Sequence, residues 1–243
     1  MCELFGASAA RARGLSGWLN PFRTRGGGTA DNPDGWGVAS WRAGDLRIEK
    51  APEPGATSER LAALARTLET RVLIAHVRKA RHPPVPGMLN THPFVHACCG
   101  REWVFAHNGL VPEMIEREPE AVVCRPDGET DSEHAFCHLL GAIAACYEGG
   151  SECDWLGRLG QQAGSIAALG KFNFLLSDGD VLVAYGHDRL HHCECDRLAL
   201  VATEPLTQEV WVPFARGELR VYKAGELLLQ RVAAPPQPAA AAA

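Results

Sequence analysis

Cys2 is the residue best placed for nucleophilic chemistry, because removal of Met1 would leave it at the amino terminus. Its thiolate could attack a carbonyl carbon. Its own α-amine, with an unperturbed pKa of about 7.7–8.0, could take the thiol proton and later pass it to a leaving amine. This pairing is the amino-terminal form of a nucleophile with its base. The alternative is that Cys2 is a buried thiol in a first strand, a common place for a free cysteine.

Three further positions carry groups that suit the same reaction. Arg78 is a cation that can hold a carboxylate through two parallel hydrogen bonds. Asn108-Gly109 offers a side-chain amide and a backbone N–H, the two kinds of donor that form an oxyanion hole. Asp131 could pair with an ammonium group. Each also has a plain structural interpretation: a surface ion pair for Arg78, a tight turn for Asn108-Gly109 and a first-turn helix acid for Asp131.

Two other segments could wall the pocket that these groups would form. Arg25-Gly26 opens the first of two glycine clusters, and Asn90-Thr91-His92 follows a proline-rich stretch at residues 83–86. Glycine clusters indicate that the backbone passes close to a ligand or to another strand. These two lack the strand-to-helix context of a dinucleotide site, so phosphate binding is disfavoured.

The candidate residues fall at the ends of predicted elements, where functional sites often lie. Apolar patterning predicts strands over residues 71–78 and 103–107, which end at Arg78 and just before Asn108. Thr130 followed by Glu133 is a capping-box pattern, which predicts a helix over residues 130–147 that opens beside Asp131. Other patterns predict strands at 1–7, 36–41, 45–50, 172–177, 181–185, 197–203, 210–214 and 219–223, and helices at 58–69 and 154–169. The hydroxyl of Ser58 could cap the first of these two helices. Helices in the middle with strands on both sides favour an α+β fold with mainly antiparallel sheets.

Composition limits the choice of protein class and partner. A chain of 243 residues, 46% apolar, favours one domain, here residues 2–232, with a disordered Pro/Ala-rich tail at 233–243. The net charge is −5 and no block of like charge stands out, which argues against a nucleic-acid partner. Glu3 stands where a signal peptide would be basic, and no apolar run reaches the roughly 18 residues of a membrane span. We therefore expect a cytoplasmic protein with no membrane partner.

The nine cysteines are an odd number without a repeating framework, so reduced thiols are the expected state. One cluster, at residues 187–195, contains the imidazole and thiolate groups that zinc prefers. However, strand-like alternation would send His191, Cys193 and Cys195 to one face and His192 to the other. We therefore expect neither a bound metal ion nor a cofactor.

The chain carries an ordered set of short motifs: Cys2, Arg25-Gly26-Gly27, His76-Val77-Arg78-Lys79-Ala80, Asn90-Thr91-His92-Pro93-Phe94, His107-Asn108-Gly109 and Gly128-Glu129-Thr130-Asp131-Ser132-Glu133. This set resembles the class II glutamine amidotransferases. The Met-Cys-Glu-Leu start, Asp34-Gly35-Trp36-Gly37 and Ala202-Thr203-Glu204-Pro205-Leu206 resemble the small stand-alone bacterial members. The resemblance runs from Cys2 to about Thr207.

The resemblance implies a four-layer αββα sandwich of the N-terminal nucleophile (Ntn) hydrolase type. It implies that Cys2 attacks the side-chain amide of glutamine, a small-molecule substrate, and forms a thioester. By the same resemblance, Arg78 holds the substrate α-carboxylate and Asp131 its α-ammonium. Asn108-Gly109 would stabilise the oxyanion, and Arg25 would help to frame the nucleophile.

The sequence departs from the larger family members in two ways. Arg81 stands where they usually carry a threonine, and the chain ends near the glutaminase boundary, without a fused acceptor domain. The released ammonia would then go to an acceptor protein in trans. Two alternatives stay open: a γ-glutamyl amide hydrolase that acts on a specialised metabolite, and a catalytically degenerate binding module.

Overall fold

The computed structural model describes residues 2–81, 83–84, 86–148 and 154–232, so Met1 and the predicted tail at 233–243 lie outside it. Its helices are α1 (Ser16–Thr24), α2 (Glu59–Thr67), the 3-10 helix η1 (Pro112–Glu116), α3 (Asp131–Glu148) and α4 (Trp155–Ala167). Its strands are β1 (Glu3–Gly14), β2 (Gly35–Arg42), β3 (Asp45–Ala51), β4 (Glu69–Arg78), β5 (Phe94–Cys98), β6 (Arg101–Leu110), β7 (Lys171–Ser177), β8 (Val181–Gly186), β9 (His191–Cys195), β10 (Leu198–Ala202), β11 (Val212–Pro213), β12 (Glu218–Lys223) and β13 (Glu226–Val232). None of the described helices is long and apolar enough to cross a membrane.

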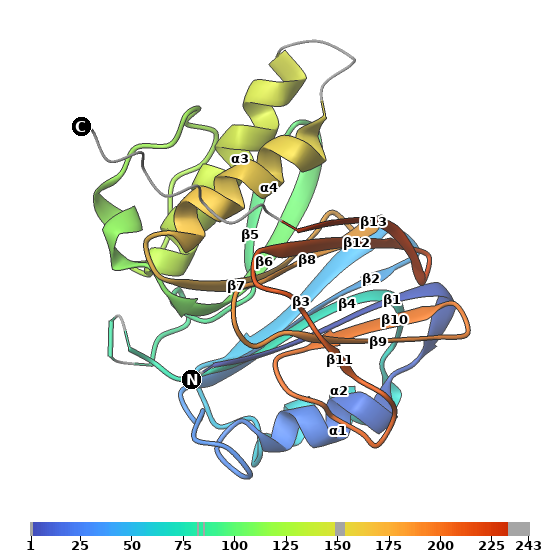
Figure 1. Ribbon diagram of the computed structural model, residues 1–243. Helices are drawn as coiled ribbons and strands as arrows, with labels where there is room; N and C mark the ends of the chain where they lie inside the picture. Colours follow the sequence, from blue (N-terminus) through green and yellow to red (C-terminus); the bar gives the residue numbers. More distant parts are fainter. Residues whose placement is uncertain (1, 82, 85, 149–153, 233–243) are drawn as a thin grey trace, which may run out of the picture.

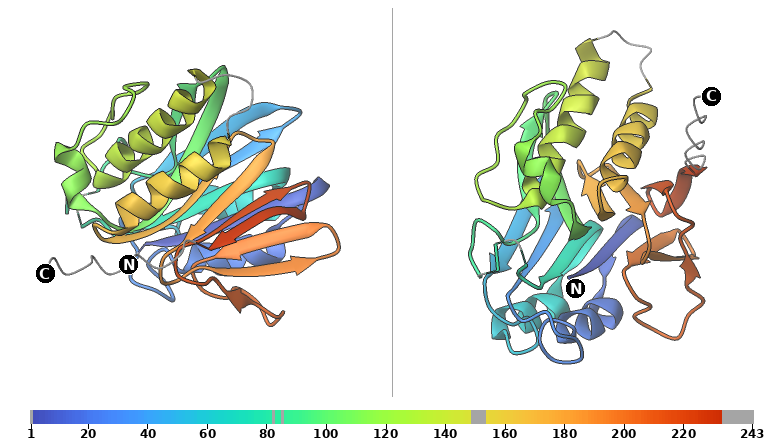
Figure 2. Two further views of the ribbon diagram at one scale, coloured as in Figure 1. Left: turned by 45° about the horizontal axis from the view of Figure 1, so that its top comes forward. Right: turned by 60° about the vertical axis from the view of Figure 1, so that its left-hand side comes forward.

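The strands form two antiparallel sheets that face each other (Figure 1). One has seven strands in the order β11-β9-β10-β1-β4-β2-β3, and the other has six in the order β13-β12-β8-β7-β6-β5. Helices α1 and α2 cover the outer face of the first sheet, and α3 and α4 cover that of the second (Figure 2). Separate apolar clusters fill the two helix–sheet layers and the space between the sheets. The predicted four-layer αββα sandwich is confirmed.

Strand β1 lies in the middle of the first sheet and brings Cys2 to one end of it. Phe5 and Ala7 face the α1/α2 layer, whereas Leu4 faces the second sheet, as the two-residue period of a strand requires. Gly6 shares the inner face, where an added Cβ would lie only 2.9 Å from Cδ1 of Leu175. The antiparallel pairing of Glu3 with Val77 sets Cys2 beside the residues that follow β4.

Strand β6 continues through Asn108 and Gly109, so the predicted strand end before Asn108 was wrong, as was the tight-turn alternative. Asn108 pairs with Asn173 and Gly109 pairs with Phe172 on β7. A Cβ on Gly109 would lie 1.8 Å from the carbonyl oxygen of Lys171, so this part of the ladder needs glycine. Strands β5 and β13 were not predicted, and β11 is shorter than the predicted strand at residues 210–214.

Local capping signals predicted two helix starts correctly. The hydroxyl of Ser58 accepts from the Leu61 N–H at 3.3 Å at the start of α2. At the start of α3, the hydroxyl of Thr130 accepts from the Glu133 N–H at 3.2 Å. The carboxylate of Glu133 accepts from the Gly128 N–H at 2.8 Å and so holds the preceding loop.

The expectation that the cysteines are reduced was wrong for Cys124 and Cys137. These two residues form a disulfide that joins the segment 117–130 to α3. The sequence offered no sign of this pairing, because only the return of that segment across the helix brings the two residues together. Among the described residues, the free cysteines are Cys2, Cys98, Cys99, Cys193 and Cys195.

Candidate active site

Cys2 lies immediately before β1, and the segment after β4 holds its sulfur. The Lys79 N–H donates to Sγ at 3.2 Å, and the thiol lies 3.4 Å from the Lys79 carbonyl oxygen. Asp34 fixes this segment by accepting from the Ala80 N–H at 2.8 Å. Burial raises the pKa of the Cys2 thiol, although the Lys79 N–H and the charge of Arg78 act in the opposite direction. The nucleophile therefore rests as a thiol, and its attack on a carbonyl needs a base.

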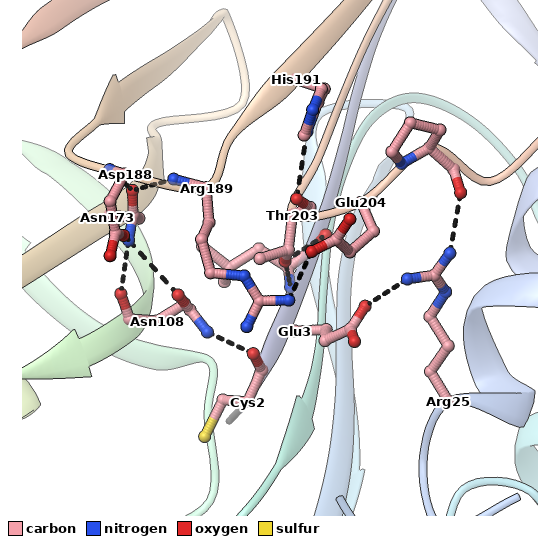
Figure 3. Close-up of polar contacts among 12 residues, drawn as sticks. Cys2, Glu3, Arg25, Asn108, Asn173, Asp188, Arg189, His191, Thr203 and Glu204 are labelled. Carbon is pink, nitrogen blue, oxygen red and sulfur yellow. Dashed lines mark hydrogen bonds and ion pairs between the residues drawn. The ribbon is translucent and has the colours of Figure 1, made fainter. Parts of the chain in front are cut away.

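Asn108 connects the second sheet to the nucleophile. Its buried side-chain amide donates from Nδ2 to the carbonyl oxygen of Cys2. On its other side, Oδ1 accepts from Nδ2 of Asn173 at 3.3 Å. Figure 3 shows Asn108 between the two residues. Because an amide has one donor end and one acceptor end, the contact with Asn173 turns the donor end of Asn108 toward Cys2.

Asn173 was missed by sequence analysis. It is fully buried on β7, and its Nδ2 also lies 3.1 Å from the Asn108 carbonyl and 2.8 Å from Oδ1 of Asp188. Its Oδ1 accepts from the backbone N–H groups of His187 (2.7 Å), Asp188 (3.0 Å) and Arg189 (3.4 Å). The sequence signal that could have found it is an asparagine between two phenylalanines in an apolar strand. Because a buried amide needs polar partners, such a residue indicates a hydrogen-bond network inside the fold.

One pocket is lined by five of the predicted site residues, namely Cys2, Arg78, His92, Gly109 and Asp131. Arg78 ends β4, and its guanidinium contacts the Pro83 carbonyl at 3.4 Å. Asp131 opens α3, and its Oδ2 accepts from the Val111 N–H at 2.6 Å. Both side chains are almost completely buried. The pocket thus brings together the thiol, the guanidinium of Arg78 and the carboxylate of Asp131, and Lys79 and Arg81 also line it.

Three buried histidines lie behind and beside this pocket. The rings of His76 and His92 pack with their centroids 4.2 Å apart and their planes tilted by 32°, and His107 contacts the hydroxyl of Ser132 at 2.8 Å. Burial lowers the pKa of all three, to about 3 for His76. They are therefore neutral near pH 7. His92 and His107 line the pocket as uncharged walls.

Arg25 and Gly26 lie outside the pocket lining. Arg25 donates to the carboxylate of Glu3 at 2.8 Å and to the Pro205 carbonyl at 2.7 Å, so it acts on the residue that follows the nucleophile (Figure 3). Gly26 forms a β-bridge with Asp31, and an added Cβ would lie 3.0 Å from the backbone of Gly55. Glycine is therefore needed at this position because the backbone of Gly55 passes close to it.

The αββα sandwich, with a cysteine that leads into its central strand beside a pocket, is the fold of the Ntn hydrolases. Two solved structures of low sequence identity share the fold. Glutamine phosphoribosylpyrophosphate amidotransferase of B. subtilis has a TM-score of 0.66 at 14% identity, over 95% of this chain and 49% of that chain. The regulatory enzyme of purine biosynthesis has a TM-score of 0.70 at 16% identity, over 95% of this chain and 49% of that chain.

The chain belongs to the class II glutamine amidotransferase family, because the sequence model of that family matches residues 1–195. It is an enzyme with the fold of the Ntn type, and Cys2 is its candidate nucleophile. YafJ of Escherichia coli (strain K12) is 32% identical over 93% of this chain and 99% of its own length. A predicted glutamine amidotransferase of Pseudomonas aeruginosa, solved as a crystal structure, has a TM-score of 0.68 at 30% identity, over 94% of this chain and all of that chain. An uncharacterised protein of Methanocaldococcus jannaschii is 33% identical over 94% of this chain and 71% of its own length.

Proposed function

We propose that this enzyme hydrolyses the γ-amide of L-glutamine through a Cys2 thioester and releases ammonia for an acceptor protein in trans. The observation that carries the proposal is the pocket in which Cys2, Arg78 and Asp131 meet. A guanidinium and a carboxylate match the α-carboxylate and the α-ammonium of a free amino acid. An N-acylated glutamine would lack one of these charges, and a glutamine inside a peptide would lack both.

The reaction would start with transfer of the Cys2 thiol proton to its α-amine, after removal of Met1. Sγ then attacks the γ-carbonyl carbon, and the oxyanion receives hydrogen bonds from Nδ2 of Asn108 and the N–H of Gly109. The α-ammonium of Cys2 returns the proton to the leaving nitrogen, so ammonia departs and the thioester remains. Water, deprotonated by the same amine, hydrolyses the thioester to glutamate.

The position of Asn108 supports this role, because its donor already points at the first residue of the mature chain. The neutral state of His92 supports it as well. Burial holds the pKa of His92 well below its ordinary value, which makes this histidine a poor general base near pH 7 and favours the α-amine as the base.

The direct test measures ammonia and glutamate release from L-glutamine by protein whose mature amino terminus has been checked by intact-mass spectrometry. Cys2→Ser removes the proposed nucleophile and keeps the shape of the side chain. Its matched control is Cys193→Ser, which removes a buried thiol far along the chain. Activity in wild type and Cys193→Ser but not in Cys2→Ser is expected. Wild type that carries a free Cys2 and releases no ammonia from glutamine would refute the proposal.

A second candidate function, hydrolysis of a γ-glutamyl amide with an acidic leaving group, is favoured by one observation. Arg81 is exposed and lines the pocket beside Arg78, where larger family members usually carry a threonine. Its charge could attract a carboxylate on the leaving amine. γ-Glutamylglycine and the neutral γ-glutamylethylamide form a matched pair of substrates. Arg81→Gln should lower kcat/KM only for the first, by up to about fivefold, because an exposed ion pair contributes at most about 1 kcal/mol.

A further inference from the structure

A second cluster of reactive side chains lies on the outer helix layer and plays no part in the proposed reaction. It consists of His96 on β5, Cys124 in the segment 117–130 and Cys137 in the second turn of α3. One ligand atom from each lies within 4.8 Å of the other two, and the two sulfurs are joined as a disulfide. Cys137 is buried, and the His96 side chain is 11% exposed.

The chemistry of these three donors is that of a zinc site. Thiolate and imidazole are the ligands that zinc prefers, and it binds them at about 2.3 Å and 2.0–2.1 Å. Donors on such an ion stand about 3.5–4 Å apart. A reduced Cys124 would reach this spacing by a small movement of its segment, while β5 and α3 hold the other two donors in place.

Glu133 adds a partner of the kind that metal-binding histidines usually have. It lies one helical turn before Cys137, and its Oε1 is 3.2 Å from Nε2 of His96. Its other oxygen accepts from the Gly128 N–H at 2.8 Å, which fixes the carboxylate. A carboxylate that orients the ring of a histidine ligand is typical of zinc sites.

The other described thiol pairs offer no such set. Cys98 and Cys99 are sequence neighbours with sulfurs 3.0 Å apart. Cys193 and Cys195 lie on β9, where His191 contacts the Thr203 carbonyl and His192 pairs with Glu194. Within the part of the chain that the structure describes, only His96, Cys124 and Cys137 gather as a His/Cys group.

We propose that reduction of the Cys124–Cys137 disulfide opens a site for one zinc ion, bound by both thiolates and His96. A cellular dithiol of the thioredoxin class supplies two electrons and two protons, so the S–S bond breaks and the reductant becomes the disulfide. Zn²⁺ then displaces both thiol protons, and a water completes the coordination. The disulfide is the metal-free state. This departs from the sequence-based expectation of no metal, and it does not rest on the proposed glutaminase activity.

The test uses the full chain in a Cys2→Ser background, because an amino-terminal cysteine can chelate metals through its own amine and thiol. Protein is reduced, treated with a chelator, desalted without oxygen and titrated with Zn²⁺ or Co²⁺. One equivalent of zinc by elemental analysis, and a thiolate-to-cobalt charge-transfer band, are expected in the reduced protein. The oxidised form of the same chain should bind none, which gives a reference that does not depend on a mutation.

Variants then assign the ligands. Cys124→Ser and His96→Asn should each lose the tight site, and Glu133→Gln should weaken it by about 10- to 100-fold. The matched control, Cys193→Ser with Cys195→Ser, should keep it. The proposal is overturned if reduced and oxidised protein bind equally, or if the cobalt band survives in Cys124→Ser. It is also overturned if the control variant abolishes the band while circular dichroism shows a native fold.

Discussion

Asn173→Asp tests whether catalysis depends on the orientation of the Asn108 amide, because it changes a residue that orients Asn108 and leaves Asn108 itself unchanged. The variant keeps the oxygen that accepts from the N–H groups of residues 187–189. It replaces the Nδ2 donor by a second oxygen, which then faces the Asn108 Oδ1, the Asn108 carbonyl and the Asp188 Oδ1 at 2.8–3.3 Å. Asn108 can relieve this repulsion by rotating its amide by half a turn. Its oxygen would then point at the Cys2 end of the pocket.

The expected effect on catalysis is that of one lost oxyanion donor. Removal of such a donor lowers kcat by about 10²- to 10³-fold, or roughly 2.7–4 kcal/mol of transition-state stabilisation. KM should change little, because the α-carboxylate and α-ammonium contacts are untouched. The buried, unpaired oxygens should also cost about 1–3 kcal/mol of unfolding free energy, so activity is compared at temperatures where both proteins are folded.

The decisive assay is a double-mutant cycle in kcat for glutamine hydrolysis with Asn108→Ala. If Asn173 acts through Asn108, the double variant should be no slower than Asn108→Ala alone. Lys171→Gln is the matched control, because it removes the ion pair with Asp188 and leaves the Asn173–Asn108 and Asn173–Asp188 contacts in place. Losses that multiply in the double variant, or a near wild-type kcat for Asn173→Asp, would show that this account of the orientation is wrong.

Four further predictions rest on the geometry of the pocket and the histidines around it. An uncleavable amino-terminal tag should inactivate the enzyme, since Cys2 would lose its α-amine, whereas a carboxy-terminal tag should not; turnover by protein whose mass still includes Met1 would contradict this. Arg78→Lys should raise KM for glutamine strongly, because an ammonium cannot reproduce the two parallel hydrogen bonds of guanidinium. N-acetylglutamine and D-glutamine should not be hydrolysed by the wild-type enzyme. Equal turnover of N-acetylglutamine and glutamine would show that Asp131 does not bind the α-ammonium. Stability should fall as the pH drops from about 6.5 toward 3, because the unfolded chain protonates His76 in this range while the folded protein, in which burial lowers its pKa to about 3, does not. By pH 4.5 this one group should lower the free energy of unfolding by roughly 2–3 kcal/mol. Urea denaturation at several pH values should show that the free energy of unfolding falls less steeply with pH in His76→Gln than in wild type. The same dependence on pH in both proteins would contradict this prediction.

The sequence alone was informative wherever a signal is local. Alternation and apolar runs located most strands, and the hydroxyl caps at Ser58 and Thr130 located the starts of α2 and α3. Residue chemistry was also local information. A thiol that could become amino-terminal indicated a candidate nucleophile, and an arginine at the end of a buried strand indicated a candidate carboxylate contact. Each also had a plain structural alternative. The ordered motifs then predicted the sandwich.

Tertiary structure decided what depends on partners far apart in the chain. Asn108-Gly109 is a turn signal by composition, yet it continues a strand, because β7 supplies hydrogen-bond partners from more than sixty residues away. Asn173 is an ordinary strand residue until the loop at residues 187–189 and Asn108 converge on its amide. Cys124 and Cys137 pair only because the segment 117–130 folds back over α3. In each case the deciding interaction is long-range, and no short stretch of sequence contains both of its partners.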